Sequence, residues 1–137
     1  MIEKFNGIFY LIIFLVHFLI FAVYAYQTVF ATKTFLDKFG IDDTGAGMTR
    51  FFGSLFIGAV AMAIWVGFIR ADGLQGTWAF FNLIFVQNAC ILIANTYSIK
   101  FDKTGIKNDS NEGVIAPLVF TILSAVLIYG LSDKIYI

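Results

Sequence analysis

The chain has 137 residues, of which 60% are hydrophobic, 18% aromatic and 13% charged, and its mean hydropathy is +0.87. Soluble domains contain about 45–50% apolar and about 25% charged residues, so this composition excludes an ordinary soluble domain and indicates a membrane protein. Nine basic residues balance nine acidic ones, and without a basic stripe a nucleic acid is not an expected partner. The single cysteine and single histidine exclude an intrachain disulfide and any site that needs two His ligands from one copy.

Four segments are apolar over the length that a membrane-crossing helix needs, about 20 residues. In chain order they are residues 7–30, which carry no formal charge, 51–69, 77–98, which are the most polar, and 114–131, with Pro117 in the first turn. The first run exceeds the roughly 7–15 apolar residues of a signal peptide, so we expect a retained helix. The sequence therefore predicts an all-α membrane protein, a bundle of four transmembrane helices in a single domain over residues 1–137.

Four spans place both termini on one side of the membrane and the loops 31–50 and 99–113 on the other. The terminal side carries the basic residues Lys4, Arg70 and Lys134, and the loop side carries Lys33, Lys38, Arg50, Lys100, Lys103 and Lys107. Because cytoplasmic loops are enriched in Lys and Arg, this distribution favours cytoplasmic loops and external termini.

The two longer loops share a short sequence pattern. Residues 36–41 read LDKFGI and residues 101–106 read FDKTGI. A parallel duplication of a helical hairpin, with a pseudo-twofold axis along the membrane normal, predicts such a repeat, and chance similarity is the alternative. Gly40 and Gly105 are expected as left-handed residues that end helices, with Lys38 and Lys103 in the last turns. Calcium binding is disfavoured, because the spacing lacks the EF-hand pattern of oxygen ligands.

The first span contains one ionisable residue, His17, on the same helix face as Tyr10 and Tyr24, seven residues to either side. An ionisable side chain within a span is a functional-site hypothesis, because it is costly in hydrocarbon. This face has the chemistry to conduct protons, to bind a quinone headgroup or to give haem one axial ligand. The alternative is a neutral histidine that forms a hydrogen bond with a neighbouring helix.

Polar side chains form a second stripe in the third span. At about 100° per residue, Gln87, Asn88, Asn95 and Ser98 share one sector of the helix. Polar side chains in lipid need partners, so this face is expected to point inward or toward another subunit. Helix packing and ligand contact are both open, and the candidate ligand-contact residues are Tyr10, His17, Tyr24, Gln87, Asn88 and Asn95.

Small residues repeat at four-residue spacing in the second span. One strip contains Ala59, Ala63 and Gly67, and an adjacent strip contains Ser54 and Gly58. Such patterns let helix backbones approach closely. These five residues are therefore the predicted helix-packing positions.

The sequence lacks the residues that several kinds of transport and catalysis need. No Asp or Glu lies within a predicted span, which argues against a carboxylate relay for proton-coupled transport. The sequence contains no C-x-x-C, no HExxH, no P-loop and no nucleophile elbow, so no catalytic residue and no metal ligand is assigned. Cys90, between Ala89 and Ile91, is expected to be a small buried residue.

Two passages resemble the DoxX-like group of small four-helix integral membrane proteins. They are residues 40–53, which run from a loop into the Gly- and Ala-rich second span, and residues 95–105 (NTYSIKFDKTG), which close the third span. Because the group has no uniform activity, the resemblance implies a four-helix bundle and transfers no catalytic residue.

The favoured interpretation is a non-enzymatic accessory or structural subunit that packs against a larger membrane complex or against its own copies. The abundance of Phe, the small-residue strips and the wide apolar helix faces indicate such a role. The alternative is a small membrane protein that binds a quinone, haem or lipid headgroup around His17 and the Asn88/Asn95 face. No obligatory cofactor is predicted, and membrane lipid is the expected ligand. A pore is disfavoured, because the sequence has no ring of charge and no selectivity-filter motif.

Overall fold

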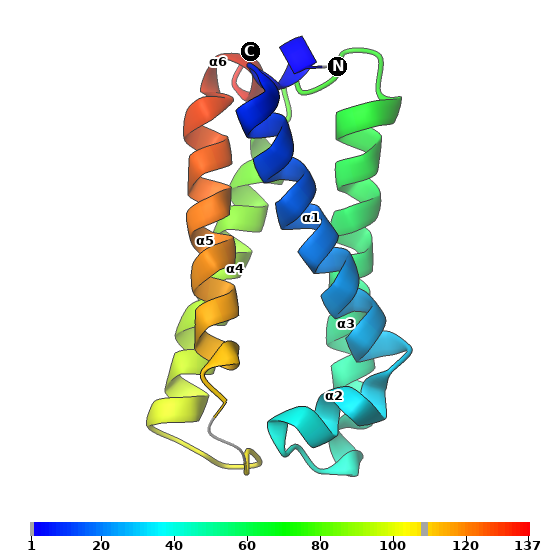
Figure 1. Cartoon of the computed structure of the whole chain (residues 1–137), viewed down its shortest axis with the longest axis vertical. Coiled ribbons are helices and arrows are strands. Elements are labelled where there is room, and N and C mark those ends of the chain that lie inside the picture. Colours follow the sequence, from blue (N-terminus) through cyan, green and yellow to red (C-terminus); the bar gives the residue numbers. More distant parts are fainter. Residues whose placement is uncertain (1, 108–109) are drawn as a thin grey trace.

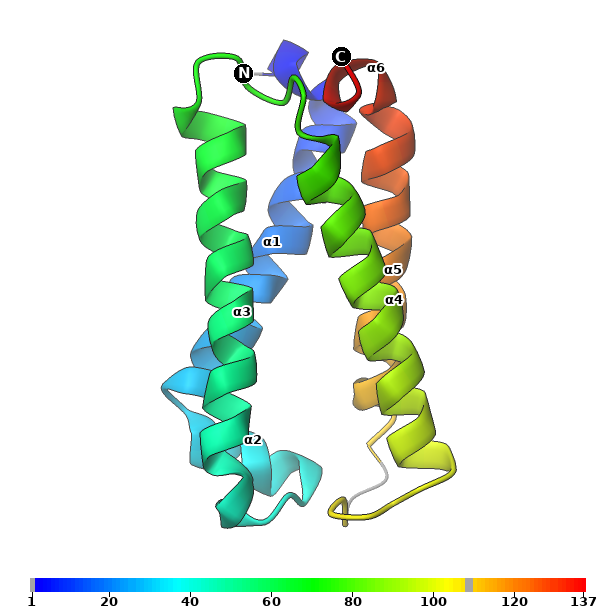
Figure 2. The ribbon, with the colours of Figure 1, turned by 180° about the vertical axis from the view of Figure 1, so that it is seen from behind.

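Four long apolar helices form the protein (Figure 1, Figure 2), and the computed structural model describes residues 2–107 and 110–137. The long helices are α1 (Ile8–Val29), α3 (Ala46–Ile64), α4 (Trp78–Lys100) and α5 (Glu112–Gly130). The short segments are η1 (Ile2–Phe5), α2 (Thr32–Phe39), η2 (Asp43–Gly45), the π-helical turn η3 (Trp65–Ile69) and α6 (Ser132–Ile135). Each long helix has the length and composition to cross a membrane. The predicted all-α, four-helix bundle is confirmed, and its candidate spans suggest a multi-pass membrane protein.

The four helices form two hairpins. Helix α1 packs along α3, and α4 packs along α5, while α1 also contacts α5 and so joins the hairpins. The hairpins lie close together at the end that carries both termini and diverge toward the end that carries α2 (Figure 1, Figure 2). The termini share one end, as four spans require. We call this end the terminal end and the opposite one the loop end.

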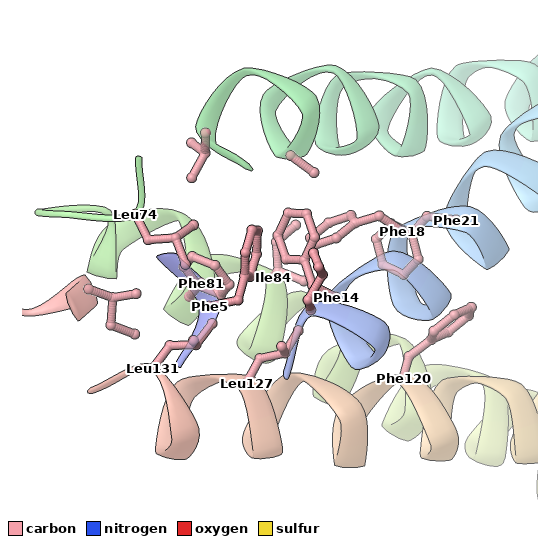
Figure 3. Packing of buried hydrophobic residues seen from close by; sticks show 14 of the residues in the cluster. Phe5, Phe14, Phe18, Phe21, Leu74, Phe81, Ile84, Phe120, Leu127 and Leu131 are labelled. Carbon is pink, nitrogen blue, oxygen red and sulfur yellow. The ribbon is translucent and has the colours of Figure 1, made fainter. Parts of the chain in front are cut away.

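Aromatic and aliphatic side chains fill the terminal end (Figure 3). The ring centroid of Phe14 lies 4.9 Å from that of Phe5 and 4.8 Å from that of Phe18. Further buried residues of this part of the core include Leu74, Phe81, Ile84, Leu127, Leu131 and Ile135. Lipid tails are as apolar as these side chains, so the stabilisation within the membrane comes from close van der Waals contact rather than from leaving water.

The two loops that share a sequence pattern meet at the loop end. Ile41 and Ile106, which occupy corresponding positions of the pattern, form an isolated antiparallel β-bridge. The amide of Lys107 also donates a hydrogen bond to the carbonyl of Gly40, with an N···O distance of 3.1 Å. These backbone contacts connect the α2 side of the molecule to the segment after α4.

The backbone paths of the two loops differ. Gly40 ends α2 in the left-handed conformation (φ 62°), with Lys38 in the last turn, as predicted. Gly105 (φ 80°) lies in a turn beyond the end of α4 at Lys100. The expectation that Gly105 ends a helix with Lys103 in its last turn is therefore wrong, because α4 stops before the pattern begins. The duplication of a hairpin stays a prediction. The pairing of Ile41 with Ile106 favours it, and the different backbone paths of the two loops argue against it.

A glycine lets α1 and α3 approach closely. A Cβ atom built at Gly53 would lie 2.8 Å from Thr28 Cβ and 2.8 Å from Val29 Cγ2, much closer than non-bonded carbon atoms pack. Gly58 in the same helix is exposed, and a Cβ atom built there has no heavy atom within 4 Å. The two glycines therefore form a matched pair in which one position is crowded and the other is open.

Substitution at these glycines tests the α1–α3 contact. We expect Gly53→Ala to lower the free energy of unfolding by about 1–3 kcal/mol, which is typical of overpacking. Gly58→Ala should leave stability unchanged or raise it by up to about 1 kcal/mol, because alanine favours a helix over glycine by that amount. Thermal unfolding in one detergent compares the variants. Equal melting temperatures for the two would contradict the close contact at Gly53.

Candidate functional site

A buried polar cluster joins three helices near the middle of the bundle. It consists of His17 of α1, Asn88 of α4 and Ser124 of α5, each at most 3% exposed. His17 Nε2 lies 3.2 Å from Asn88 Nδ2 and 3.0 Å from Ser124 Oγ, and Asn88 Nδ2 donates to Ser124 Oγ over 2.7 Å. The serine hydroxyl donates to the carbonyl of Phe120 over 2.6 Å. A neutral imidazole whose Nε2 accepts from the Asn88 amide fits the 3.2 Å contact, and its proton then lies on Nδ1.

Aromatic rings enclose the imidazole. The ring centroids of Phe18 and Phe21 lie 4.7 Å from that of His17, and the centroid of Phe120 lies 5.5 Å away. Among the described residues, His17 Nδ1 and Asn88 Oδ1 are buried without a hydrogen-bond partner. An axial haem bond to Nε2 would have to displace the amide and hydroxyl that already contact it, so the geometry favours helix packing at His17. Haem stays a prediction that a visible absorption spectrum tests.

The Tyr10–His17–Tyr24 face does not form a single site. The ring of Tyr10 lies against Gly130 toward the terminal end. The hydroxyl of Tyr24 donates to Glu112 Oε1 over 2.8 Å at the start of α5. His17 lies between them in the polar cluster, so residues on one face of α1 meet different neighbours along its length.

Asn95 compensates for the proline in α5. The helix begins at Glu112, so Pro117 lies in its second turn and not, as predicted, in the first. Proline has no N–H, and the carbonyl of Gly113, four residues earlier, therefore has no helical donor. Asn95 Nδ2 donates to that carbonyl over 2.9 Å. A side chain of α4 thus satisfies a backbone group that lipid cannot.

The other two residues of the predicted polar stripe of α4 take part in neither the His17 cluster nor the contact with Gly113. Gln87 and Ser98 are half-buried and lie outside both the His17 cluster and the cavity described below. Cys90 is exposed, so the expectation of a buried cysteine is wrong. The reason is helical geometry, because Asn88 points inward and a position two residues later is rotated by about 200°.

An apolar cavity of about 380 Å³ lies between the two hairpins at the loop end. Its volume falls within the range of small-molecule sites, about 300–1,000 Å³. All of the helices α1 to α5 contribute to its lining. The aromatic part of the lining consists of Phe35, Phe39, Phe52, Phe56 and Phe120, and the polar part consists of Tyr24, Thr28, Thr49, Asn95 and Glu112. Phe120 also contacts the His17 ring, so it separates the cavity from the polar cluster.

One ion pair stands at the loop end of the cavity. Lys38 Nζ of α2 lies 2.6 Å from Glu112 Oε2 and 2.7 Å from Oε1, the oxygen that also accepts from Tyr24. The pair connects the first hairpin to the second. Sequence reasoning missed Glu112 as a site residue because it precedes the apolar run of the fourth span. The available signal was its place within one helical turn of that run, since helices commonly extend past the apolar core of a span.

Ser124 was also missed, although a signal existed. It is a polar side chain in the predicted fourth span, and such side chains need partners in lipid. Nothing in the sequence states which helix supplies the partner. The packing of α1, α4 and α5 around position 124 determines it.

The predicted packing residues of α3 and η3 divide between two faces. Ala63 and Gly67 are buried, and Ala59 is half-buried. A Cβ atom built at Gly67 would lie 3.1 Å from the ring of Phe14. Ser54 and Gly58 are exposed on the outside of the bundle. One strip therefore serves packing within the chain, and the Ser54–Gly58 strip is open.

Two exposed aspartates organise the turns at the loop end. The backbone amide of Thr44 donates to Asp42 Oδ1 over 3.0 Å and lowers the pKa of that carboxyl. The hydroxyl and the amide of Thr104 both donate to Asp102 Oδ1, and they lower its pKa in the same way. Both carboxyls lie outside the cavity lining and serve the local turns.

Comparison of the chain with models of known protein families, with curated proteins and with solved structures finds no match. The resemblance to the DoxX-like group therefore stays an expectation from the two sequence passages. Function has to be argued from the cluster, the cavity and the helix faces.

A double-mutant cycle tests the link between Asn95 and Pro117. We expect Asn95→Ala to lower the free energy of unfolding by about 1–3 kcal/mol, because the carbonyl of Gly113 loses its donor in apolar surroundings. In the Pro117→Ala background the restored amide N–H supplies that donor within α5. Asn95→Ala should then cost much less, as measured by unfolding in detergent. An equal cost in both backgrounds would show that Asn95 acts by some other contact.

Proposed function

We propose that the protein binds an amphipathic, lipid-like molecule in the cavity between its two hairpins and acts without catalysis. The observation that carries the proposal is the lining, in which aromatic and aliphatic walls surround a few polar groups near Glu112. Sites for small molecules have this character, with mostly apolar walls and a few polar groups that orient the ligand.

The long direction of the proposed site runs from the edge of the membrane span toward its middle, as a lipid in one leaflet does. Glu112 begins α5, and Phe120 lies eight residues further, about 12 Å along the helix axis. The Glu112 end of the cavity therefore lies at the edge of the span, beside Phe39 of α2, and its Phe120 end lies toward the middle. A ligand with its headgroup near Glu112 and its chain toward Phe120 matches the polarity of the bilayer at both levels.

The proposed route from the bilayer passes between the outer helices. Helices α3 and α4 are not closely packed against each other, and Figure 2 shows them diverging toward the loop end. Both line the cavity, α3 through Phe52 and Phe56 and α4 through Ile91 and Ile99. An amphiphile dissolved in the membrane would enter between them without crossing water.

The proposed ligand site lies apart from the histidine. Tyr24 and Asn95 line the cavity, whereas His17 and Asn88 lie behind Phe120. A lipid headgroup, which the alternative interpretation of the sequence includes, fits the mixture of apolar walls and polar groups.

Photolabelling tests the proposal. A long-chain alcohol with a diazirine in its chain is added to the protein in phosphatidylcholine nanodiscs, and labelled residues are identified by mass spectrometry. We expect residues of the cavity lining to be labelled several-fold more than lipid-facing residues such as Ile93, because a bound chain stays beside the lining. Ala116→Trp should remove the excess, since Ala116 lines the cavity and a large side chain fills it.

The control is Ala94→Trp, on the exposed surface of α4, which should leave the labelling pattern unchanged. Melting temperatures of both variants verify that they fold. If the lining and the outer faces of the unchanged protein were labelled equally, the proposal would be contradicted.

A second candidate function is that of an accessory subunit in a larger membrane assembly or in an assembly of identical copies. The open Ser54–Gly58 strip of α3 favours it, because a Cβ atom built at Gly58 meets no heavy atom within 4 Å. Small residues at this spacing allow a further helix to pack closely. The strip lies outside the cavity, so the two functions are compatible.

Native mass spectrometry after gentle purification tests this association. We expect a complex with a second copy or another membrane protein, which Gly58→Leu should weaken because the larger side chain blocks close helix approach. Ala94→Leu, on the exposed face of α4, is the control and should leave the complex intact. A protein that is purified only as a monomer would contradict the accessory role.

A further inference from the structure

The charge on the cavity lining is compensated within the protein. Glu112 is the one charged residue among the described residues of the lining. Lys38 Nζ lies within 2.7 Å of both of its carboxylate oxygens, and the hydroxyl of Tyr24 donates to Oε1 over 2.8 Å. Each carboxylate oxygen thus already has a charged donor, and the pair as a whole is neutral.

The other polar groups of the lining carry no charge. The hydroxyl of Thr28 donates to the carbonyl of Tyr24 over 2.6 Å, and the amide nitrogen of Asn95 donates to the carbonyl of Gly113. The Thr28 hydroxyl is engaged as a donor and Asn95 Nδ2 uses one of its two N–H groups, so Asn95 Oδ1 and the Thr28 oxygen have capacity to accept hydrogen bonds from a ligand. A ligand that donates hydrogen bonds complements this set.

We infer that the cavity selects an amphiphile with an uncharged, hydrogen-bond-donating headgroup, such as a long-chain alcohol or a monoacylglycerol. The inference rests on the proposed function and adds the headgroup class. An anionic headgroup would have to take Lys38 from Glu112 and leave the carboxylate without its cation. A cationic headgroup would meet a carboxylate that Lys38 already neutralises, and an unpaired charge in an apolar site is costly.

The ion pair is suited to substitution. The side chains of Lys38 and Glu112 are 43% and 37% exposed, and ion pairs with this much solvent contact contribute little to stability. Changes at Lys38 should therefore alter ligand preference more than folding. Lys33 offers a matched control on the same helix, because it pairs with Asp37 and Asp43, which raise its pKa, and lies outside the lining.

The experiment compares three amphiphiles with the same diazirine-labelled chain and an alcohol, a sulfonate or a trimethylammonium headgroup. Each is added to the unchanged protein in phosphatidylcholine nanodiscs at equal mole fraction. We expect the alcohol to label cavity-lining residues about tenfold more than either charged amphiphile, because each charged headgroup lacks a free counter-charge there. Equal labelling by all three, or preferential labelling by the sulfonate or the ammonium, would overturn the inference while leaving the proposed binding function intact. If none of the three amphiphiles labelled the lining residues more than the outer faces, the binding function itself would be overturned.

A variant then tests the source of the preference. Lys38→Met leaves Glu112 without its cation, so labelling by the trimethylammonium amphiphile should rise to at least the level of the alcohol. Lys33→Met removes the same charge from α2 and should keep the preference of the unchanged protein. Unaltered preference in Lys38→Met, with unaltered melting temperature, would overturn the assignment of selectivity to this ion pair.

Discussion

The buried polar groups of this chain have to find partners within the protein, because hydrocarbon offers none. The second hairpin depends on this constraint. Asn88 and Asn95 lie seven residues apart on one face of α4, and both donate to α5, one to Ser124 and one to the carbonyl of Gly113. The first hairpin is held differently, through the close approach of α1 and α3 at Gly53. Hydrogen bonds of polar side chains thus fix the register of α4 against α5. The absence of a side chain at Gly53 allows the close packing of α1 against α3.

The cavity follows from where the hairpins are joined. At the terminal end the ring centroid of Phe14 in α1 lies 6.2 Å from that of Phe81 in α4, and in the middle His17 reaches Asn88 and Ser124 across the interface between hairpins. Beyond Phe120 the polar contact between α1 and α5 is the hydrogen bond from Tyr24 to Glu112, which is only partly buried. The helices diverge there, and large side chains line the space without filling it. A tight core at one end and a cavity at the other therefore arise from the same pair of crossing hairpins.

The sequence was sufficient for the spans and insufficient for the site, for physical reasons. Membrane spans are encoded locally, by the length of an apolar run, and all four were found. The need of Asn88 and Asn95 for partners was also visible, because it depends on the side chain and the solvent alone. Their actual partners depend on which helices meet, and so does the meeting of Lys38 and Glu112, 74 positions apart. Pro117 shows the same limit, since its effect on Gly113 follows from the sequence once the helix start is known, while the rescue by Asn95 does not.

The two ends of the bundle also differ in what holds them. The terminal end is closed by fully buried side chains such as Phe5 and Leu131, whose contacts cannot be replaced by water. The loop end is closed by a partly exposed ion pair and by the short backbone bridge between Ile41 and Ile106. Solvent competes for both of these contacts, so separating the hairpins there costs less than separating them at the core. The end that holds the cavity is thus also the end at which the hairpins are held less strongly.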